Sequence, residues 1–195
     1  MIKLGVTGGI GSGKTHVCSI ISAMGYPIFN ADLESRRIVD INQKVIASIK
    51  NLFGDDIYIN NLLDRKKVAE IVFTDTEKLE KLNSIVHPAV VDFFNEWVLQ
   101  YKSRSLVVKE AAILFESGAY KGVDKIISVI APTELRVQRL MNRDGLSRET
   151  ILNRINIQLP QEELIKRSNY IIENDGLKLI LPQIVRVIND IVKEK

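Results

Sequence analysis

One eight-residue segment near the N-terminus constrains the fold more than any other part of the chain. Residues 8–15 read Gly-Gly-Ile-Gly-Ser-Gly-Lys-Thr, which satisfies the pattern G-x-x-x-x-G-K-[ST] in full. Its glycines let the backbone curl with positive φ, so that bare N–H groups can touch a phosphate. A loop of this kind joins a strand to a helix. The segment therefore predicts a strand–loop–helix unit at the start of an α/β fold.

The residues on either side of the loop support this prediction. Ile2, Leu4 and Val6 alternate before it as in a strand, and apolar residues follow it at helical spacing from Val17 to Met24. A glycine-rich turn that binds nothing would not need this context. The pattern predicts that a nucleoside triphosphate binds here, with Lys14 reaching its β- and γ-phosphates and the Thr15 hydroxyl ligating Mg²⁺.

Composition limits the class of protein. The chain has 195 residues, enough for one domain with insertions or for two small domains. Its net charge of +3 and its lack of a Lys/Arg run do not argue for nucleic acid. The chain contains no apolar stretch of 18 residues, so no segment is predicted to span a membrane. Cys18 is the only cysteine, and the chain runs directly into its first strand without a signal peptide, so we expect a cytoplasmic protein.

Five short apolar runs predict the strands of one sheet. They are nearly continuous rather than alternating, which is typical of parallel strands covered on both faces. Helical patterns separate them, so we expect a three-layer α/β fold with right-handed crossovers, closed by a helix over Leu177–Lys193. The five runs are Ile2–Thr7, Pro27–Asn30, Leu106–Glu110, Lys125–Ile130 and Tyr170–Glu173.

Two segments do not belong to this sheet. Residues 33–102 form a helical insertion, and residues 134–163 form an Arg-rich lid; the core comprises 1–32, 103–133 and 164–195. Both segments leave from the carboxyl edge of the strands, where ligands bind in open α/β sheets. Within the insertion we expect helices over Ile38–Leu52, Arg65–Val72 and Thr76–Lys102, with Asp75 or Thr76 as the N-cap of the last, and Pro88 opening a further helix after His87.

Asp32 has two interpretations from its position alone. It follows the second strand, where a carboxylate could accept the proton of an alcohol during phosphoryl transfer. Asp is equally a favoured N-cap, here for a helix beginning at Leu33.

Three arginines on one predicted helix, Arg136, Arg139 and Arg143, could form part of a lid. Arg139 and Arg143 are four residues apart and share a face, from which they could stabilise the transferred phosphoryl group. The alternative is a solvated face that pairs with Glu134 or Glu149. The phosphate-loop pattern in the same chain favours the catalytic interpretation.

Two further residues have less certain roles. Glu110 ends the third strand, where it could support Mg²⁺ or be satisfied by Lys109 or a backbone N–H. A lone His87 is more often structural, and without a Cys/His cluster a zinc site is unsupported.

The chain lacks Asn-Lys-x-Asp, the run with which GTPases recognise guanine, and is short for a motor or transport ATPase. A small-molecule kinase remains. At this point the chain resembles the dephospho-coenzyme A kinase family, from Leu4 to about Gly176. The matching motifs, in order, are 7–14, Ala31-Asp32 with Arg36, Phe53-Gly54, Leu63-Asp64-Arg65, Val72-Phe73, Leu82-Asn83 with His87-Pro88, Leu114 to Ser117, Gln138-Arg139 with Arg143-Asp144, Arg154-Ile155 with Gln158, and Ile172 with Asn174-Asp175-Gly176.

The resemblance implies transfer of the γ-phosphoryl group of ATP to the ribose 3′-hydroxyl of dephospho-coenzyme A. It implies that Asp32 is the base, that Lys14, Arg139 and Arg143 assist the transfer, and that the insertion binds coenzyme A. The ATP-binding residues would be Gly9, Gly11, Ser12, Gly13, Lys14, Thr15 and His16, with Asn174 and Gly176 bordering the adenine. The acceptor would contact Asp32, Arg36, Leu63, Arg65, His87 and Glu110.

Three positions depart from the family pattern. Asn30 stands where a first acid is usual, Ala112 replaces a usual Pro, and Glu110 stands where Asp is common. The alternatives are a nucleoside monophosphate or shikimate-type kinase, or a nucleotide-binding module without catalysis. The long insertion with His87-Pro88 argues against the first of these. The sequence leaves the oligomeric state open.

Overall fold

The computed structural model describes residues 1–193, and the chain divides into two compact units. The first unit comprises Met1–Asn30 and Gln100–Lys195, and the second comprises Ala31–Leu99. Each is described below by itself. Within residues 1–193, no helix is both long and apolar enough to cross a membrane.

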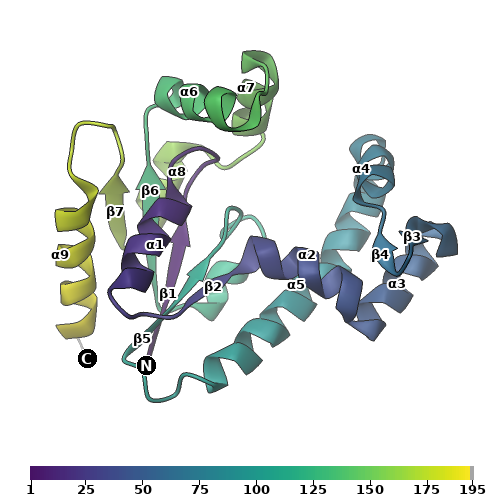
Figure 1. Ribbon diagram of the computed structural model, residues 1–195, viewed down its shortest axis with the longest axis horizontal. Helices are drawn as coiled ribbons and strands as arrows, with labels where there is room; N and C mark the ends of the chain where they lie inside the picture. The colour runs from purple at the N-terminus through teal and green to yellow at the C-terminus, as the bar shows by residue number, and fades with distance from the viewer. Residues whose placement is uncertain (194–195) are drawn as a thin grey trace. The chain divides into compact units, whose positions relative to one another are not determined.

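The first unit contains the predicted parallel sheet, with the strand order β2-β5-β1-β6-β7 (Figure 1). The prediction of an α/β fold on a five-stranded parallel sheet is confirmed. The second strand begins one residue later than expected, because Pro27 has no N–H for the ladder, although its carbonyl accepts from Val108 N at 2.9 Å. The strands are β1 Ile2–Thr7, β2 Ile28–Asn30, β5 Leu106–Glu110, β6 Lys125–Ile130 and β7 Tyr170–Glu173.

The register brings particular strand ends together. Glu110, the last residue of β5, pairs with Val6 of β1 on one side and with Asn30 of β2 on the other. The central strand β1 then leads directly into the glycine-rich loop. The loop and the last residues of β2 and β5 therefore lie at one carboxyl edge of the sheet, where open α/β sheets bind their ligands.

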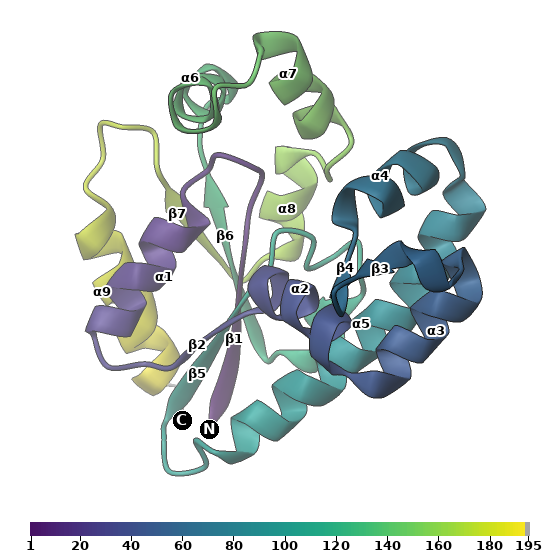
Figure 2. The ribbon, with the colours of Figure 1, turned by 45° about the vertical axis from the view of Figure 1, so that its right-hand side comes forward.

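Two helices cover one face of this sheet, α1 Lys14–Ala23 and α9 Ile180–Lys193, which lie side by side in both views (Figures 1 and 2). They bury their apolar faces against the strands in one continuous cluster. The final helix begins at Ile180 rather than at Leu177, because residues 174–179 form a separate loop. The fully or almost fully buried residues of the cluster are Leu4, Val6, Val17, Cys18, Ile21, Leu106, Val108, Ile127, Val129, Ile172, Ile184, Val187, Ile188 and Ile191.

The Arg-rich segment forms three helices in the first unit, α6 Thr133–Asp144, α7 Arg148–Asn156 and α8 Gln161–Arg167. Gly145 ends α6 in the left-handed conformation, with φ of 65°, and Ser147 caps α7 by accepting from Thr150 N. A small core of Val137, Leu140 and Ile151 joins α6 to α7. In Figure 2 both helices lie beyond the carboxyl end of β6.

The second unit is helical, with a short hairpin that the sequence analysis did not anticipate. Its elements are α2 Ala31–Ile41, α3 Gln43–Phe53, β3 Tyr58–Ile59, β4 Leu62–Leu63, α4 Arg65–Thr74 and α5 Thr76–Leu99. Asn60 and Asn61 join the two strands with φ of 51° and 65°. Two successive residues with positive φ are the requirement of a type I′ turn, and Asn tolerates this conformation.

None of the three helix ranges expected in this unit matches the structure, and Arg65–Val72 differs least, since α4 continues to Thr74. The segment Ile38–Leu52 is divided between two helices, because Asn42 leaves the helix and its Oδ1 accepts from Lys44 N and Val45 N at 3.0 and 3.2 Å. The helix that begins at Thr76 ends at Leu99 and not at Lys102. Its predicted cap at Asp75 is confirmed, since Oδ1 of this residue accepts from Lys78 N at 3.0 Å.

Pro88 does not open a new helix but lies inside α5. A proline at an interior position donates no hydrogen bond to the carbonyl four residues earlier, here Ser84, and its ring crowds that carbonyl. A helix boundary was predicted at Pro88 because of this energetic cost. The helix continues because tertiary packing along its whole length outweighs a local cost of about 3 kcal/mol.

Candidate active site

Two glycines show how closely the phosphate-binding loop is surrounded. Gly8 has φ of 149°, and a Cβ on it would lie 2.2 Å from the carbonyl oxygen of Val129. Gly13 has φ of 98°, and a Cβ there would lie 2.2 Å from Nδ2 of Asn174. Only glycine fits at either position.

The positive end of α1 points at the loop. Gly13 is the N-cap of α1 and offers no side-chain acceptor, and the first turn carries no acidic residue. No capping side chain or acidic residue of the first turn therefore competes with an anion at this end of the helix, and the helix dipole favours an anion there.

The Lys14 side chain is bent back over the loop. Its Nζ donates to the carbonyls of Gly8 at 2.8 Å and of Gly9 at 3.3 Å, and the residue is 9% exposed. The ammonium group thus lies on the inner side of the loop, beside a pocket of about 280 Å³. This pocket is lined by Gly11, Gly13, Lys14, Thr15, His16, Arg139, Leu140 and Arg143.

Glu110 is the buried carboxylate of the site, 4% exposed at the end of β5. Its Oε1 accepts from the Thr15 hydroxyl at 2.7 Å and its Oε2 from Asn30 Nδ2 at 3.0 Å. The Asn30 amide therefore donates a hydrogen bond to Glu110, where an aspartate would repel it.

Cys18 lies one turn after Thr15 and is also close to Glu110. Burial, together with the charge of Glu110 and a hydrogen bond to it, raises the pKa of the Cys18 thiol. The residue is 3% exposed and stays protonated, as a packed core thiol.

The donor set at this edge fits Mg²⁺ held partly by the protein. Thr15 and Glu110 bring a hydroxyl and a carboxylate oxygen within 2.7 Å of each other. Mg²⁺ takes only one or two protein oxygens when phosphates and water supply its other ligands. Residues 1–193 hold no cluster of three or more His, Cys, Asp or Glu side chains suited to a metal, so a site built from protein ligands alone is not supported there.

Arg139 joins helix α6 to the loop by hydrogen bonds. Its Nη1 donates to the carbonyls of Gly11 and Ser12, each at 3.4 Å, and its Nη2 donates to Asn174, to the backbone O at 3.3 Å and to Oδ1 at 3.0 Å. Asn174 in turn donates Nδ2 to Ser12 O at 2.7 Å. Arg139 and Asn174, both predicted site residues, therefore lie at the loop. The Arg139 guanidinium donates to backbone oxygens and to the Asn174 amide oxygen.

Arg143 differs from Arg139 although both lie on α6. It pairs with the neighbouring Asp144 at 2.7 and 2.9 Å, is largely exposed, and lines the pocket beside Lys14. Hydrogen bonding to Arg143 lowers the pKa of the Asp144 carboxyl. The structure shows other partners than Glu134 or Glu149 for both arginines, namely Gly11, Ser12 and Asn174 for Arg139 and Asp144 for Arg143. Glu134 is held instead by Arg148.

Two residues that support the loop were not assigned this role from the sequence. Arg136 is 6% exposed, donates Nε to Ile10 O at 2.8 Å, and lies so close to Gly9 that a Cβ there would be 2.3 Å from its Nη2. Gln158 accepts from Ile10 N at 2.7 Å. The position of Arg136 one turn before Arg139 was a usable signal. Nothing in the sequence joined residue 158 to residue 10.

In the second unit, Asp32 is the second residue of α2, which begins directly after β2. The helix starts at Ala31, so the interpretation of Asp32 as the N-cap of a helix starting at Leu33 is wrong. The Asp32 carbonyl accepts from the Ser35 hydroxyl at 3.0 Å.

Three of the residues predicted to contact the acceptor substrate, Arg36, Leu63 and Arg65, lie around Asp40. No role was predicted for Asp40 from the sequence. Arg65 donates Nη2 to Arg36 O at 2.9 Å and forms an ion pair with Asp40. Leu63 N donates to Asp40 Oδ1 at 3.0 Å. His87 is half-buried within α5, where burial lowers its pKa, and within residues 31–99 it has no hydrogen bond to this group.

The chain was compared with known families and proteins. A family profile described as dephospho-CoA kinase matches residues 2–179. A dephospho-CoA kinase of Bacteroides fragilis is 37% identical over 96% of this chain and 91% of its own length. That of Chlorobaculum tepidum is 43% identical over 90% and 87%. A solved dephospho-CoA kinase structure from Campylobacter jejuni is 29% identical and superposes with a TM-score of 0.72, over 98% of both chains.

Proposed function

The chain belongs to the dephospho-CoA kinase family, and from this premise we propose how its own residues carry out the reaction. The protein is a phosphotransferase of coenzyme A biosynthesis, which phosphorylates dephospho-CoA at the ribose 3′-hydroxyl at the expense of ATP. In the reaction a bond forms between the 3′-oxygen and the γ-phosphorus, and the bond to the β–γ bridging oxygen breaks. The products are coenzyme A and ADP.

The loop residues form the ATP site in this proposal. The pocket that Lys14, Thr15 and Arg143 line against the N-terminus of α1 is the observation that carries it, because it combines bare N–H groups with two cations. When ATP binds, the Lys14 ammonium gives up its hydrogen bonds to Gly8 O and Gly9 O and donates to phosphate oxygens instead. Gly9, Gly11, Ser12, Gly13 and His16 line the phosphates, and Asn174 and Gly176 border the adenine.

Arg143 stabilises the charge that spreads over the transferred phosphoryl oxygens, and its exposed ion pair with Asp144 is cheap to exchange. Arg139 assists by holding α6 on the loop. Thr15 and Glu110 would hold Mg²⁺. A magnesium ion held by these two residues would supply positive charge that offsets the negative charge of the phosphates.

The second unit supplies the acceptor site in this proposal. Asp32 accepts the proton of the 3′-hydroxyl as the new bond to phosphorus forms. Arg36 and Arg65 offer positive charge to the phosphate groups of the acceptor, with Asp40 orienting Arg65. Leu63 and His87 complete the residues of this unit that we propose to contact the acceptor, and Glu110 of the first unit is a further proposed contact. We place the reaction in the cytoplasm, because a chain whose single cysteine, Cys18, is a buried free thiol has no internal disulfide, as is typical of a reducing compartment.

Substitution of Asp32 by Asn tests the assignment of the base. We expect kcat to fall about 10²- to 10⁴-fold, because the amide cannot accept the proton, while the affinity for ATP changes little. ADP release with dephospho-CoA as acceptor measures the first, and ATP titration measures the second. Asp92→Asn, an exposed change on α5, is the matched control.

The same assay separates the alternatives. Monophosphates and shikimate should not accelerate ADP release by the wild-type protein. Turnover of those acceptors but not of dephospho-CoA would contradict the proposed function, and full activity of Asp32→Asn would remove Asp32 from the mechanism.

A further inference from the structure

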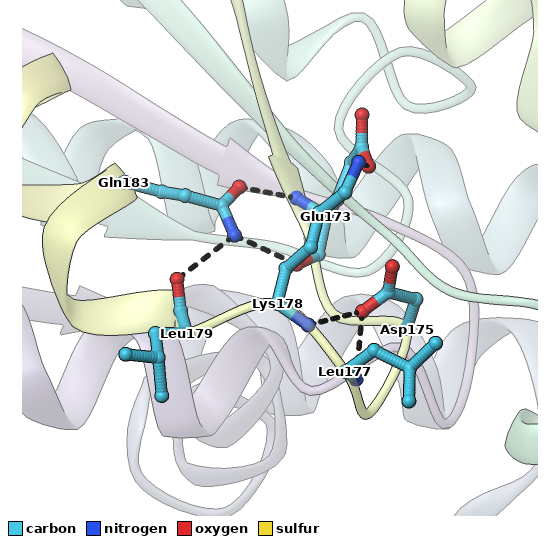
Figure 3. Close-up of polar contacts among 6 residues, drawn as sticks. All are labelled: Glu173, Asp175, Leu177, Lys178, Leu179 and Gln183. Atoms are coloured by element: carbon cyan, nitrogen blue, oxygen red, sulfur yellow. Dashed lines mark hydrogen bonds and ion pairs between the residues drawn. The ribbon is translucent and has the colours of Figure 1, made fainter.

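The loop of residues 174–179, between β7 and α9, is closed at both ends by one side chain. Gln183, in the first turn of α9, accepts from Glu173 N through Oε1 at 2.9 Å. Its Nε2 donates to Glu173 O at 3.0 Å and to Leu179 O at 3.1 Å. Figure 3 shows this amide between the residue that precedes the loop and the residue that ends it.

Gln183 acts here as a substitute for a neighbouring strand. The strand β7 lies at the edge of the sheet, with β6 on its inner side. The N–H of Asn174 donates inward, to Ile130 O of β6 at 2.8 Å. The N–H and C=O of Glu173, one residue earlier, both meet the Gln183 amide instead. A carboxamide has one acceptor and two donors, so it can pair with both groups of an edge residue as a peptide would.

The segment fixed in this way carries Asn174, which contacts the phosphate loop. Asn174 is 7% exposed, donates to Ser12 O at 2.7 Å, and accepts from Arg139 at 3.0 Å. The space between Asn174 and Gly13 would not hold a methyl group, since a Cβ on Gly13 would lie 2.2 Å from Nδ2. A small displacement at the end of β7 therefore has to move Ser12, Gly13 or Arg139.

The other contacts of the loop are local. Asp175 Oδ1 accepts from Leu177 N at 2.9 Å and from Lys178 N at 2.8 Å, and Lys178 forms an exposed ion pair with Glu173 (Figure 3). These bonds shape the turn after Asn174. They offer a control within the same loop, because the Lys178 ammonium meets the Glu173 carboxylate rather than its backbone.

We propose that Gln183 is a positioning residue for ATP. It holds the end of β7, and through Asn174 it sets the Ser12–Gly13 wall of the phosphate loop and the place of Arg139. The proposal rests on the proposed function, in which this loop binds the nucleotide. The hydrogen bonds of Gln183 go to the backbone of Glu173 and Leu179 rather than to the phosphate loop, so its effect on ATP acts through Asn174.

The test is the pair of variants Gln183→Met and Lys178→Met. Met is close to Gln in length but offers no amide, and we expect the KM for ATP and the Kd for ADP to rise about tenfold, as loss of one or two net hydrogen bonds would give. The KM for dephospho-CoA and kcat should stay within about twofold. Lys178→Met should leave all four quantities unchanged. Amide exchange at Glu173 should accelerate only in the Gln183 variant.

The outcomes separate this inference from the function on which it rests. An unchanged Kd for ADP in folded Gln183→Met, or equal losses for both substrates, would overturn the positioning role. If Gln183→Met does not fold, Gln183→Glu keeps the acceptor for Glu173 N and loses the donor, and the same comparison applies to it. Absence of acceptor-dependent ADP release from the wild-type protein would contradict the kinase function, while ADP binding would still test Gln183.

Discussion

Arg139 and Arg143 show that two residues of one type on one helix face can have different roles. The four donor contacts of Arg139 to Gly11, Ser12 and Asn174 make it a brace between α6 and the loop. Within residues 1–193, Arg143 has only its neighbour Asp144 as an ion-pair partner, and it lines the pocket beside Lys14. The spacing in the sequence gives both the same face and cannot distinguish these roles.

We therefore predict different kinetic effects of removing each charge. Arg143→Gln should lower kcat about 10²- to 10³-fold with little change in the KM for ATP, because it loses an interaction made in the transition state. Arg139→Gln should raise the KM for ATP, because the loop loses its brace. Steady-state kinetics measure both, and Arg148→Gln, on the exposed part of α7, is the control. Identical kcat and KM changes in the two variants would refute this division.

Glu110 gives a prediction about the metal. Glu110→Gln keeps the size of the side chain but removes its charge, so the concentration of Mg²⁺ needed for half-maximal activity should rise about tenfold or more. A chelator should abolish turnover of the wild-type protein, and added Mg²⁺ should restore it. Titration of activity with Mg²⁺ at saturating ATP measures the shift. An unchanged Mg²⁺ requirement would exclude Glu110 as a ligand and leave it the supporting role seen in its bonds to Thr15 and Asn30.

At the scale of elements, the sequence patterns identified the strands better than the helix boundaries. The five strands have nearly continuous apolar runs, and the structure confirms four of them with the same bounds and the fifth within one residue. The break at Asn42 and the continuity through Pro88 were both missed. In the first case a side-chain cap ends a pattern that looks continuous, and in the second the packing of α5 overrides a local signal.

The cap at Asn42 can be tested directly. Asn42→Ala should lower the free energy of unfolding of the second unit by about 1 kcal/mol, because Lys44 N and Val45 N lose their acceptor. Urea unfolding followed by circular dichroism measures the change. The matched control is Asn51→Ala, at an exposed position inside α3, where Ala has the higher helix propensity and should be neutral or slightly stabilising. A cap role is refuted if Asn42→Ala costs no more than that control.

At the scale of the whole molecule, the buried Lys109 links stability to pH. It lies in the central part of the sheet and is 1% exposed. Burial, with a contribution from Lys3, lowers the pKa of its ammonium to about 8. The unfolded chain keeps the proton up to its ordinary pKa of about 10.4, so between these values the unfolded state binds more protons than the folded state.

Stability should therefore rise with pH from about 8 to about 10, by at most about 3 kcal/mol for this group. Denaturant unfolding at pH 7.5, 8.5 and 9.5 measures the slope. Burial raises the pKa of Tyr58 to about 12, so ionisation of this residue in the unfolded chain would lower the stability at higher pH. The measurements therefore stop at pH 9.5. Lys109→Met should flatten the slope, and an equal slope in that variant would show that other groups produce it.

The parallel sheet, the strand–loop–helix unit and the residues of the phosphate loop were predictable from the amino-acid sequence alone, because these depend on short-range periodicity and on backbone conformations that favour glycine. Ordered motifs along the chain also pointed to the family to which the comparisons assign it. Tertiary structure decided what surrounds the loop. Arg136, Gln158, Asn174 and Gln183 are far from residues 8–15 along the chain, and only folding brings α6, the 158 segment and the end of β7 against that loop. A hydrogen bond between distant residues leaves no period in the sequence. The loop was therefore predictable from its own residues and the resemblance placed Arg139 and Asn174 near it, whereas the contacts of Arg136, Gln158 and Gln183 were found only in the structure.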